Sequence, residues 1–100
     1  MDRLKSILED TLSGYAGEAL NGHLYLTKSN QDALFSIMSI AKVGDETVIE
    51  TGIVARIIAE TIIIEKDISN KPLVDALVQN GIDRKQIVLA YAGEAIPTTG

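Results

Sequence analysis

The sequence of 100 residues contains no cysteine, no tryptophan and a single histidine. Without cysteine the chain can form no disulfide framework, no thiolate nucleophile and no cysteine-based metal site. A lone imidazole, His23, has no second histidine with which to bind a metal, and we interpret it as a surface loop residue. Aromatic residues make up only 4% of the chain although apolar residues reach 46%, so we expect an aliphatic core.

Long apolar runs are also missing. No run approaches the roughly 20 residues that a membrane-spanning helix needs, and residues 1–10 are charged and amphipathic, unlike the apolar centre of a signal peptide. We therefore expect a cytoplasmic protein that does not contact a membrane. We also expect a single domain over residues 1–100, with an irregular tail from about residue 92.

Positive charge is scarce. The chain has 9 Lys and Arg residues against 14 Asp and Glu residues, which gives a net charge of −5. The basic residues are scattered, and only Arg84 and Lys85 are adjacent. Nucleic-acid-binding proteins neutralise phosphates with clustered Lys and Arg. We therefore expect no direct, tight binding of DNA.

The clearest pattern lies in residues 61–91. Apolar runs at 62–64 and 87–91 predict two strands, and apolar residues at i, i+3 and i+4 spacing within 73–78 predict a short helix between them. A connection of about 20 residues is long enough to cross over to a parallel strand.

Local signals mark the ends of this short helix. Ser69 and Asn70 offer N-cap side chains, and Pro72 pre-sets a helical φ in the first turn. Gly81 stands where a helix C-terminus favours a residue that tolerates positive φ.

The preceding residues predict one helix followed by antiparallel strands. Residues 2–15 place Leu4, Ile7, Leu8, Leu12 and Tyr15 on one helical face. Strands are expected at 24–27, 34–41 and 47–58, and we prefer a strand to a helix at 34–41 because the Gly44-Asp45 turn leads straight into the next strand. Further turns are expected at Asn21-Gly22, Ser29–Asp32 and Ala59-Glu60, and a bulge at Gly52.

Together these elements predict an α+β fold with a mixed, mostly antiparallel sheet of four or five strands and helices on one face. Residues 53–55 and 62–64 are apolar on both strand faces. Two helices can cover only one face, so we expect the other face to meet a partner or a second copy, as in a homodimer. Coverage by loops is the alternative.

The carboxyl ends of the strands at 61–67 and 87–91 would meet at one edge of the sheet if these strands are parallel. That edge would gather Asp67, Ser69, Asn70, Tyr91 and Glu94 beside a helix N-terminus. We take these five residues as a candidate partner-contact edge. The alternative is that they are ordinary capping and turn residues.

No catalytic, cofactor-binding or metal-binding constellation stands out. Asp83 and Lys85 match only part of a nuclease motif, and Glu60, Glu65 and Asp67 are better interpreted as a solvated strand end than as a cation site. No glycine-rich phosphate loop opens a helix. The pentapeptide YAGEA occurs at 15–19 and again at 91–95, but its flanks differ and we treat the repetition as coincidence. We predict a protein that is not an enzyme and needs no cofactor.

The last forty residues resemble the XisI family, the fdxN element excision controlling factors found mainly in cyanobacteria. The segments are IIIE (62–65), KPLVDAL (71–77), NGID (80–83) and QIVLAY (86–91). The family typically shows a strand I-W-I-Q, an acidic turn, a helix ending L-x-x-x-G-[IV] and a strand I-V-L-[GA]-[FY]. This sequence departs from that pattern because it lacks the tryptophan, carries Ala59-Glu60 in place of an Asp-Gly turn and looks like a short-form relative.

The resemblance implies a non-enzymatic accessory factor that controls DNA excision during heterocyst development. Family genes usually lie beside one for a companion, XisH, which resembles restriction-type nucleases. An acidic chain would dock onto a basic, DNA-acting companion more readily than onto DNA. The alternative is an antitoxin-like or immunity protein that restrains such a nuclease-like partner.

Overall fold

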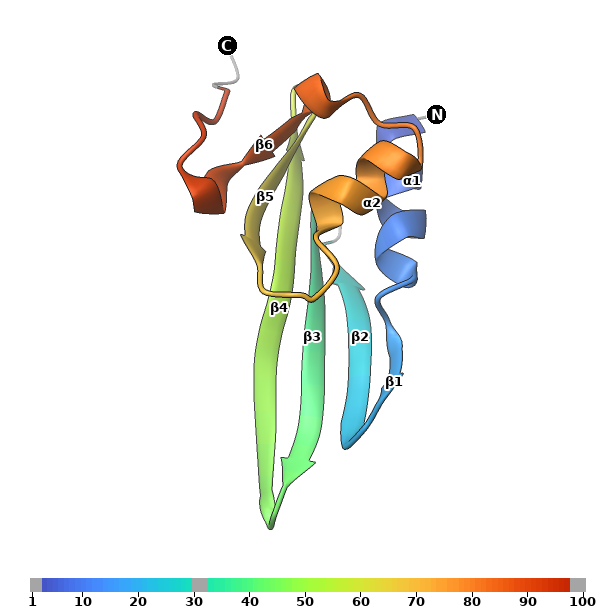
Figure 1. Ribbon diagram of the computed structural model, residues 1–100, viewed down its shortest axis with the longest axis vertical. Coiled ribbons are helices and arrows are strands. Elements are labelled where there is room, and N and C mark those ends of the chain that lie inside the picture. Colours follow the sequence, from blue (N-terminus) through green and yellow to red (C-terminus); the bar gives the residue numbers. More distant parts are fainter. Residues whose placement is uncertain (1–2, 30–32, 98–100) are drawn as a thin grey trace.

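The computed structural model describes residues 3–29 and 33–97, which form two α-helices, six strands and two 3-10 helices (Figure 1). The helices are α1 (Arg3–Ser13), α2 (Leu73–Gln79), η1 (Arg84–Gln86) and η2 (Ala90–Ala92). The strands are β1 (Gly17–Ala19), β2 (Gly22–Lys28), β3 (Leu34–Val43), β4 (Glu46–Ile58), β5 (Thr61–Asp67) and β6 (Ile87–Leu89). The predicted α+β class is confirmed. No helix in the described ranges is both long and apolar enough to span a bilayer.

The strands form one sheet in which chain order and spatial order are the same, β1-β2-β3-β4-β5-β6. The first five strands are antiparallel to their neighbours, and β6 runs parallel to β5. Parallel neighbours need a crossover, and the segment that contains α2 provides it. The strand–helix–strand unit predicted for residues 61–91 is therefore confirmed.

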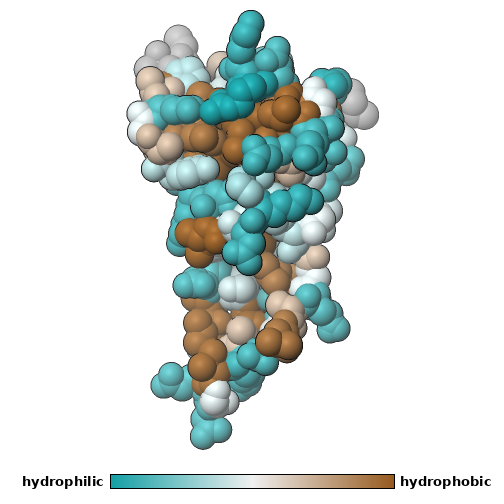
Figure 2. Space-filling model, in the orientation of Figure 1, coloured by the Kyte–Doolittle hydropathy of each residue, from teal (hydrophilic) through white to brown (hydrophobic). Residues whose placement is uncertain are grey.

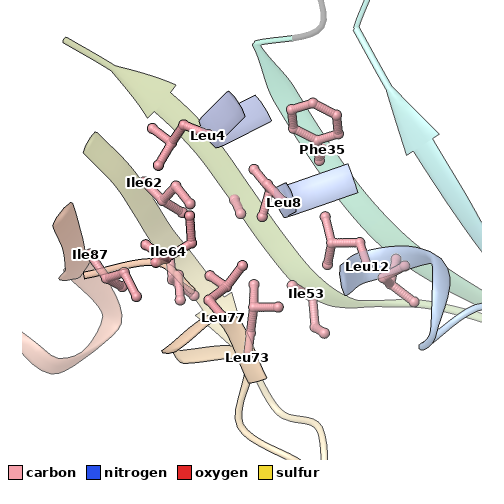
Figure 3. Packing of buried hydrophobic residues seen from close by; sticks show 13 residues of the cluster. Leu4, Leu8, Leu12, Phe35, Ile53, Ile62, Ile64, Leu73, Leu77 and Ile87 are labelled. Atoms are coloured by element: carbon pink, nitrogen blue, oxygen red, sulfur yellow. The ribbon is translucent and has the colours of Figure 1, made fainter. Parts of the chain in front are cut away.

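The core lies between the helices and one face of the sheet (Figure 3). Leu4, Leu8 and Leu12 recur every four residues on α1, so they lie on one helical face, and all three are buried. They share the core with Phe35 of β3 and Ile53 of β4. Each such burial stabilises the fold by roughly 1.5–3 kcal/mol. The core is aliphatic, as the composition predicts.

The bulge expected at Gly52 is present. Ile37 pairs with Ile53, whereas the next residue, Met38, pairs with Thr51, so Gly52 is left as the extra residue of β4. Alternation along β3 continues through this point, which keeps odd-numbered residues of β3 on the helix side of the sheet.

The turns predicted at Gly44-Asp45 and Ala59-Glu60 are also present. Gly44, between β3 and β4, has φ of 65°. Ala59 and Glu60, between β4 and β5, have φ of 48° and 64°. A two-residue turn with both φ values positive matches the right-handed twist of the strands it joins, although it normally uses Asn and Gly.

Several element boundaries differ from the sequence predictions. The sheet has six strands instead of four or five, because residues 17–19 pair with β2 as β1. β6 ends at Leu89 instead of residue 91, since residues 90–92 turn into η2. Residues 93–97 have no regular structure, in agreement with the predicted tail. The predicted turn at 29–32 falls largely on residues 30–32, outside the described residues.

The face of the sheet away from the helices is only partly open. Ile63 of β5 points to this face, since its neighbours Ile62 and Ile64 lie in the core, yet its exposed fraction is 0%. The chain therefore covers this face at β5 by itself, which corrects the expectation that residues 62–64 need a partner there. Elsewhere on the same face Tyr25 and Ile49 are exposed.

The hairpin of β3 and β4 is much longer than the helices that cover it. At 1.5 Å per residue the 11 residues of α1 span roughly 16 Å, whereas the 13 residues of β4 span roughly 43 Å at 3.3 Å per residue. The hairpin consequently extends beyond the helix layer and gives the molecule its length of 48 Å (Figure 1). We call residues 39–50 of this hairpin the arm. All residues from 42 to 50 are exposed.

Candidate functional site

Asp67, the first residue of the predicted edge, caps helix α2. Its Oδ2 accepts a hydrogen bond of 2.7 Å from the backbone N–H of Leu73, and its Oδ1 accepts one of 2.9 Å from the N–H of Ser69. A helix N-terminus leaves its first N–H groups without partners and favours negative charge. The carboxylate therefore fixes the connection between β5 and α2.

This arrangement corrects the predicted capping of α2. Ser69 and Asn70 are not the N-cap, and Pro72 is the N-cap residue itself, where it makes no side-chain capping bond. The Ser69 hydroxyl donates to Asp67 Oδ1 at 2.5 Å and is also within 2.8 Å of the Lys71 carbonyl oxygen, so Ser69 supports the cap indirectly. Local spacing misses such a cap because Asp67 reaches Leu73 across the five residues of an irregular loop, 68–72. The predicted C-terminal glycine is correct, since Gly81 has φ of 102°.

Glu94 performs a similar structural task after β6. Its Oε1 accepts a 2.8 Å hydrogen bond from the N–H of Leu89, and Arg84 donates to its Oε2 at 3.2 Å. The backbone hydrogen bond from Leu89, helped by Arg84, holds the pKa of Glu94 below its usual value. Glu94 thus closes the turn that follows the last strand.

Burial and nearby carboxylates change the pKa of Tyr91, another residue of the predicted edge. Partial burial, followed by the charges of Asp67 and Asp75, raises the pKa of Tyr91. The same causes raise the pKa of Tyr15 to about 12, and Tyr15 donates a 2.6 Å hydrogen bond to the Lys71 carbonyl oxygen. Tyr15 was expected only as part of the apolar face of the first helix. Its role depends on a contact across 56 residues, which no local pattern announces.

A polar cleft of about 370 Å³ lies between the end of α1, the β5–α2 loop and α2. Ser69 and Asn70 of the predicted edge line it together with Tyr15 and Asn80. Asn80 donates a 2.8 Å hydrogen bond to Thr11, whose hydroxyl in turn donates to the backbone of α1. The polar groups here tie α1, the loop and α2 together. Asp67, Tyr91 and Glu94 do not line the cleft.

Three other titratable candidates, His23, Asp83 and Glu65, also have structural partners. His23 lies on strand β2 instead of in a loop, and its ring packs against that of Tyr25 with centroids 4.6 Å apart and planes tilted by 43°. Asp83 accepts from the backbone N–H of Lys85, and Glu65 forms a 2.7 Å ion pair with Arg56. Within residues 3–29 and 33–97 no three His, Asp or Glu side chains gather as a metal site would require.

The arm is the second candidate site, because it exposes apolar side chains without any helix over them. The exposed fractions are 60% for Val43, 40% for Val48 and 62% for Ile49. Figure 2 shows apolar side chains interspersed with polar ones at this end of the molecule. Apolar residues that no part of the chain covers are typical of surfaces that contact another molecule.

Comparison with known proteins agrees with this architecture. A family model described as XisI protein matches residues 1–98. Two crystal structures from Anabaena variabilis share the fold, each with a TM-score of 0.66. A XisI-like protein is 17% identical, with 86% of this chain and 78% of that chain covered. The fdxN element excision controlling factor XisI is 18% identical, with 87% and 88% covered. The comparison with curated proteins found no matching sequence.

The fold is thus that of an α+β protein with a six-stranded sheet and an extended hairpin arm. With the match over residues 1–98, the chain belongs to the XisI family.

Proposed function

We propose that this chain is a non-enzymatic accessory factor in the control of DNA-element excision and that it acts by binding another protein. One support is its family, since a solved structure with the same fold is that of a fdxN element excision controlling factor. A second support is the use of its polar groups. Asp67 and Glu94, which could have served chemistry at the edge of the sheet, accept hydrogen bonds from the backbone and hold the fold together.

The observation that carries the proposal is the bare arm. Residues 42–50 are exposed on both strands of the hairpin, and several of them are apolar. An isolated arm of this kind contributes little to the core. Burial of its apolar side chains against another surface would lower the free energy, because it would remove them from water.

The partner we propose is a XisH-type, nuclease-like companion. A net charge of −5 favours association with a basic, DNA-acting protein and disfavours direct binding to phosphates. A homodimer through the exposed part of the sheet face away from the helices remains our second proposal for assembly, because Tyr25 and Ile49 are exposed there.

Co-expression with the protein encoded beside this chain tests the proposal. We expect a stoichiometric complex by size-exclusion chromatography with light scattering, and no shift of duplex DNA by this chain alone at physiological salt. The nuclease activity of the companion is then measured with and without this chain. Inhibition would indicate the antitoxin-like role, whereas unchanged or redirected activity would indicate an accessory role. If no complex forms, or if this chain alone binds DNA tightly, the proposal is wrong.

A further inference from the structure

The two faces of the arm differ in charge. Strand register places residue 24 of β2 opposite residue 39 of β3, and residues 39, 41 and 43 opposite residues 50, 48 and 46 of β4. Because these residues continue the alternation of the buried Ile37, they lie on the helix side of the sheet. We call this surface the bare face; its members used below are Leu24, Ala41, Val43, Glu46, Val48 and Glu50.

The bare face continues from the core without a helix above it. A cavity of about 180 Å³ lies at the junction, lined by Leu24, Ile53 and Ile68 among others. Ile53 is buried, whereas Ile68, on the loop above the arm, is 58% exposed. Val43 and Val48 extend the apolar strip further along the arm. The helix layer therefore stops while the apolar surface beneath it goes on.

The charges of the bare face are all negative. Glu46 and Glu50 lie on it, and Glu50 also borders the cavity. The basic residue of the arm, Lys42, lies on the opposite face, since it alternates with residues 41 and 43. An apolar strip with carboxylates at its side complements an apolar strip with Lys or Arg at its side.

We propose that the bare face binds an amphipathic, basic helix of a protein partner, which continues the helix layer along the arm. This rests on the proposed function, in which the chain acts by binding a protein. Five residue positions along each strand provide roughly 17 Å of surface, enough for about 11 helical residues. Glu46 and Glu50 are separated by about 13 Å along the strand. A helix laid along the arm advances by about nine residues over this distance, which sets the spacing of the basic residues that would meet them.

The same charges argue against a second copy of this chain as the occupant. In a two-fold symmetric contact each bare face would meet its own counterpart. Glu46 and Glu50 of one protomer would then lie near the same carboxylates of the other, with no cation on either face of the contact. Like charges brought together at an apolar contact oppose binding.

The first experiment uses defined peptides with the full chain. The probe is a fluorescent 18-residue peptide of Leu and Lys arranged to form an amphipathic helix. One control peptide has Glu in place of Lys, and another has the same Leu and Lys in an order that forms no apolar stripe. We expect binding of the first peptide only, with amide NMR shifts concentrated in residues 39–50 and at Leu24 and Ile68.

Variants of exposed residues then locate the contact. We expect Val48→Asp, and separately the pair Glu46→Lys and Glu50→Lys, to weaken binding of the Lys peptide at least tenfold. The charge-reversed pair should instead bind the Glu peptide. Thr47→Asp is the matched control, since Thr47 is adjacent to Val48, similar in size and exposed but lies on the opposite face of the arm; it should change affinity less than twofold. Amide spectra of each variant establish that it is folded.

Several results would overturn the inference. They are equal binding of the scrambled peptide, amide shifts that leave Leu24 and Ile68 unchanged, a loss with Thr47→Asp as large as with Val48→Asp, or a dimer that Val48→Asp converts to a monomer. The companion complex separates this inference from the proposed function. A complex that Thr47→Asp weakens and Val48→Asp leaves intact would keep the function and refute the surface. Absence of any complex would refute the function, while the peptide result still decides the surface.

Discussion

Replacing Asp67 with alanine tests the claim that this carboxylate, and not Ser69 or Asn70, organises the start of α2. The substitution removes the acceptor for the N–H groups of Leu73 and Ser69 and for the Ser69 hydroxyl. Helix α2 has only seven residues, too few to be stable in isolation. Its position on the sheet therefore depends on the loop that Asp67 holds.

The expected loss of stability follows from these bonds. Hydrogen bonds to a charged group are worth about 1.5–3 kcal/mol when they are protected from water. Because Asp67 is only half-buried, we take about 1 kcal/mol for each of its three hydrogen bonds. The total is about 3 kcal/mol in the free energy of unfolding, which corresponds to a decrease of roughly 12–24 °C in Tm for a domain of this size.

Urea unfolding followed by circular dichroism measures this loss. Ser69→Ala should lose about 1 kcal/mol, since it removes the hydroxyl but keeps the backbone bonds to Asp67. Asp83→Ala is the matched control: Asp83 is exposed and accepts a single 3.1 Å bond from Lys85, so we expect less than about 1 kcal/mol. If Asp67→Ala were no more destabilising than Asp83→Ala, Asp67 would not be the cap that holds α2.

Three further predictions concern the turn at Ala59-Glu60, two glycines and Tyr15. Changing Ala59-Glu60 to Asn-Gly should raise the free energy of unfolding by about 1 kcal/mol, because both positions have positive φ; an unchanged or lower Tm would contradict this. Gly22→Ala should cost about 1–3 kcal/mol, since its Cβ would lie 2.0 Å from the carbonyl oxygen of Ile40, whereas Gly52→Ala, with its nearest atoms at 3.9 Å, should cost less than about 1 kcal/mol; equal chemical-denaturation midpoints would refute this. The pKa of Tyr15 is raised from 10 to about 12, so its contribution to stability is fully present below about pH 10 and is lost as the pH rises towards 12. Absorbance titration of tyrosinate should show a component near pH 12 that Tyr15→Phe removes. The decrease in stability as the pH rises towards 12 should also be absent in this variant.

Sequence patterns predicted the elements well where the signal is local. The stripe Leu4, Leu8 and Leu12 was sufficient for α1, and Gly44 with Gly52 marked a turn and a bulge correctly. The patterns failed where a strand exists only through its neighbour. Residues 17–19 have no β-branched or aromatic side chain and form β1 only because they pair with β2.

The candidate edge was predicted in part. The expectation that β5 and β6 are parallel is confirmed, and burial together with the charge of Asp67 raises the pKa of Tyr91. Asp67 and Glu94, however, act as a capping and a turn residue, which is the alternative interpretation of this edge. The edge as a partner contact stays a prediction.

The sequence by itself determined the aliphatic core, the α+β class, the acidic charge and the family, because these depend on composition and on patterns within a few residues. The tertiary structure alone decided that the hairpin extends past the helices and that its two faces differ in charge. That outcome depends on the relative lengths of strands and helices and on the register after the bulge at Gly52. A shift of one residue in that register would exchange the faces of residues 46–50. The position of the bare face is therefore a property of how the whole sheet pairs and of no single segment.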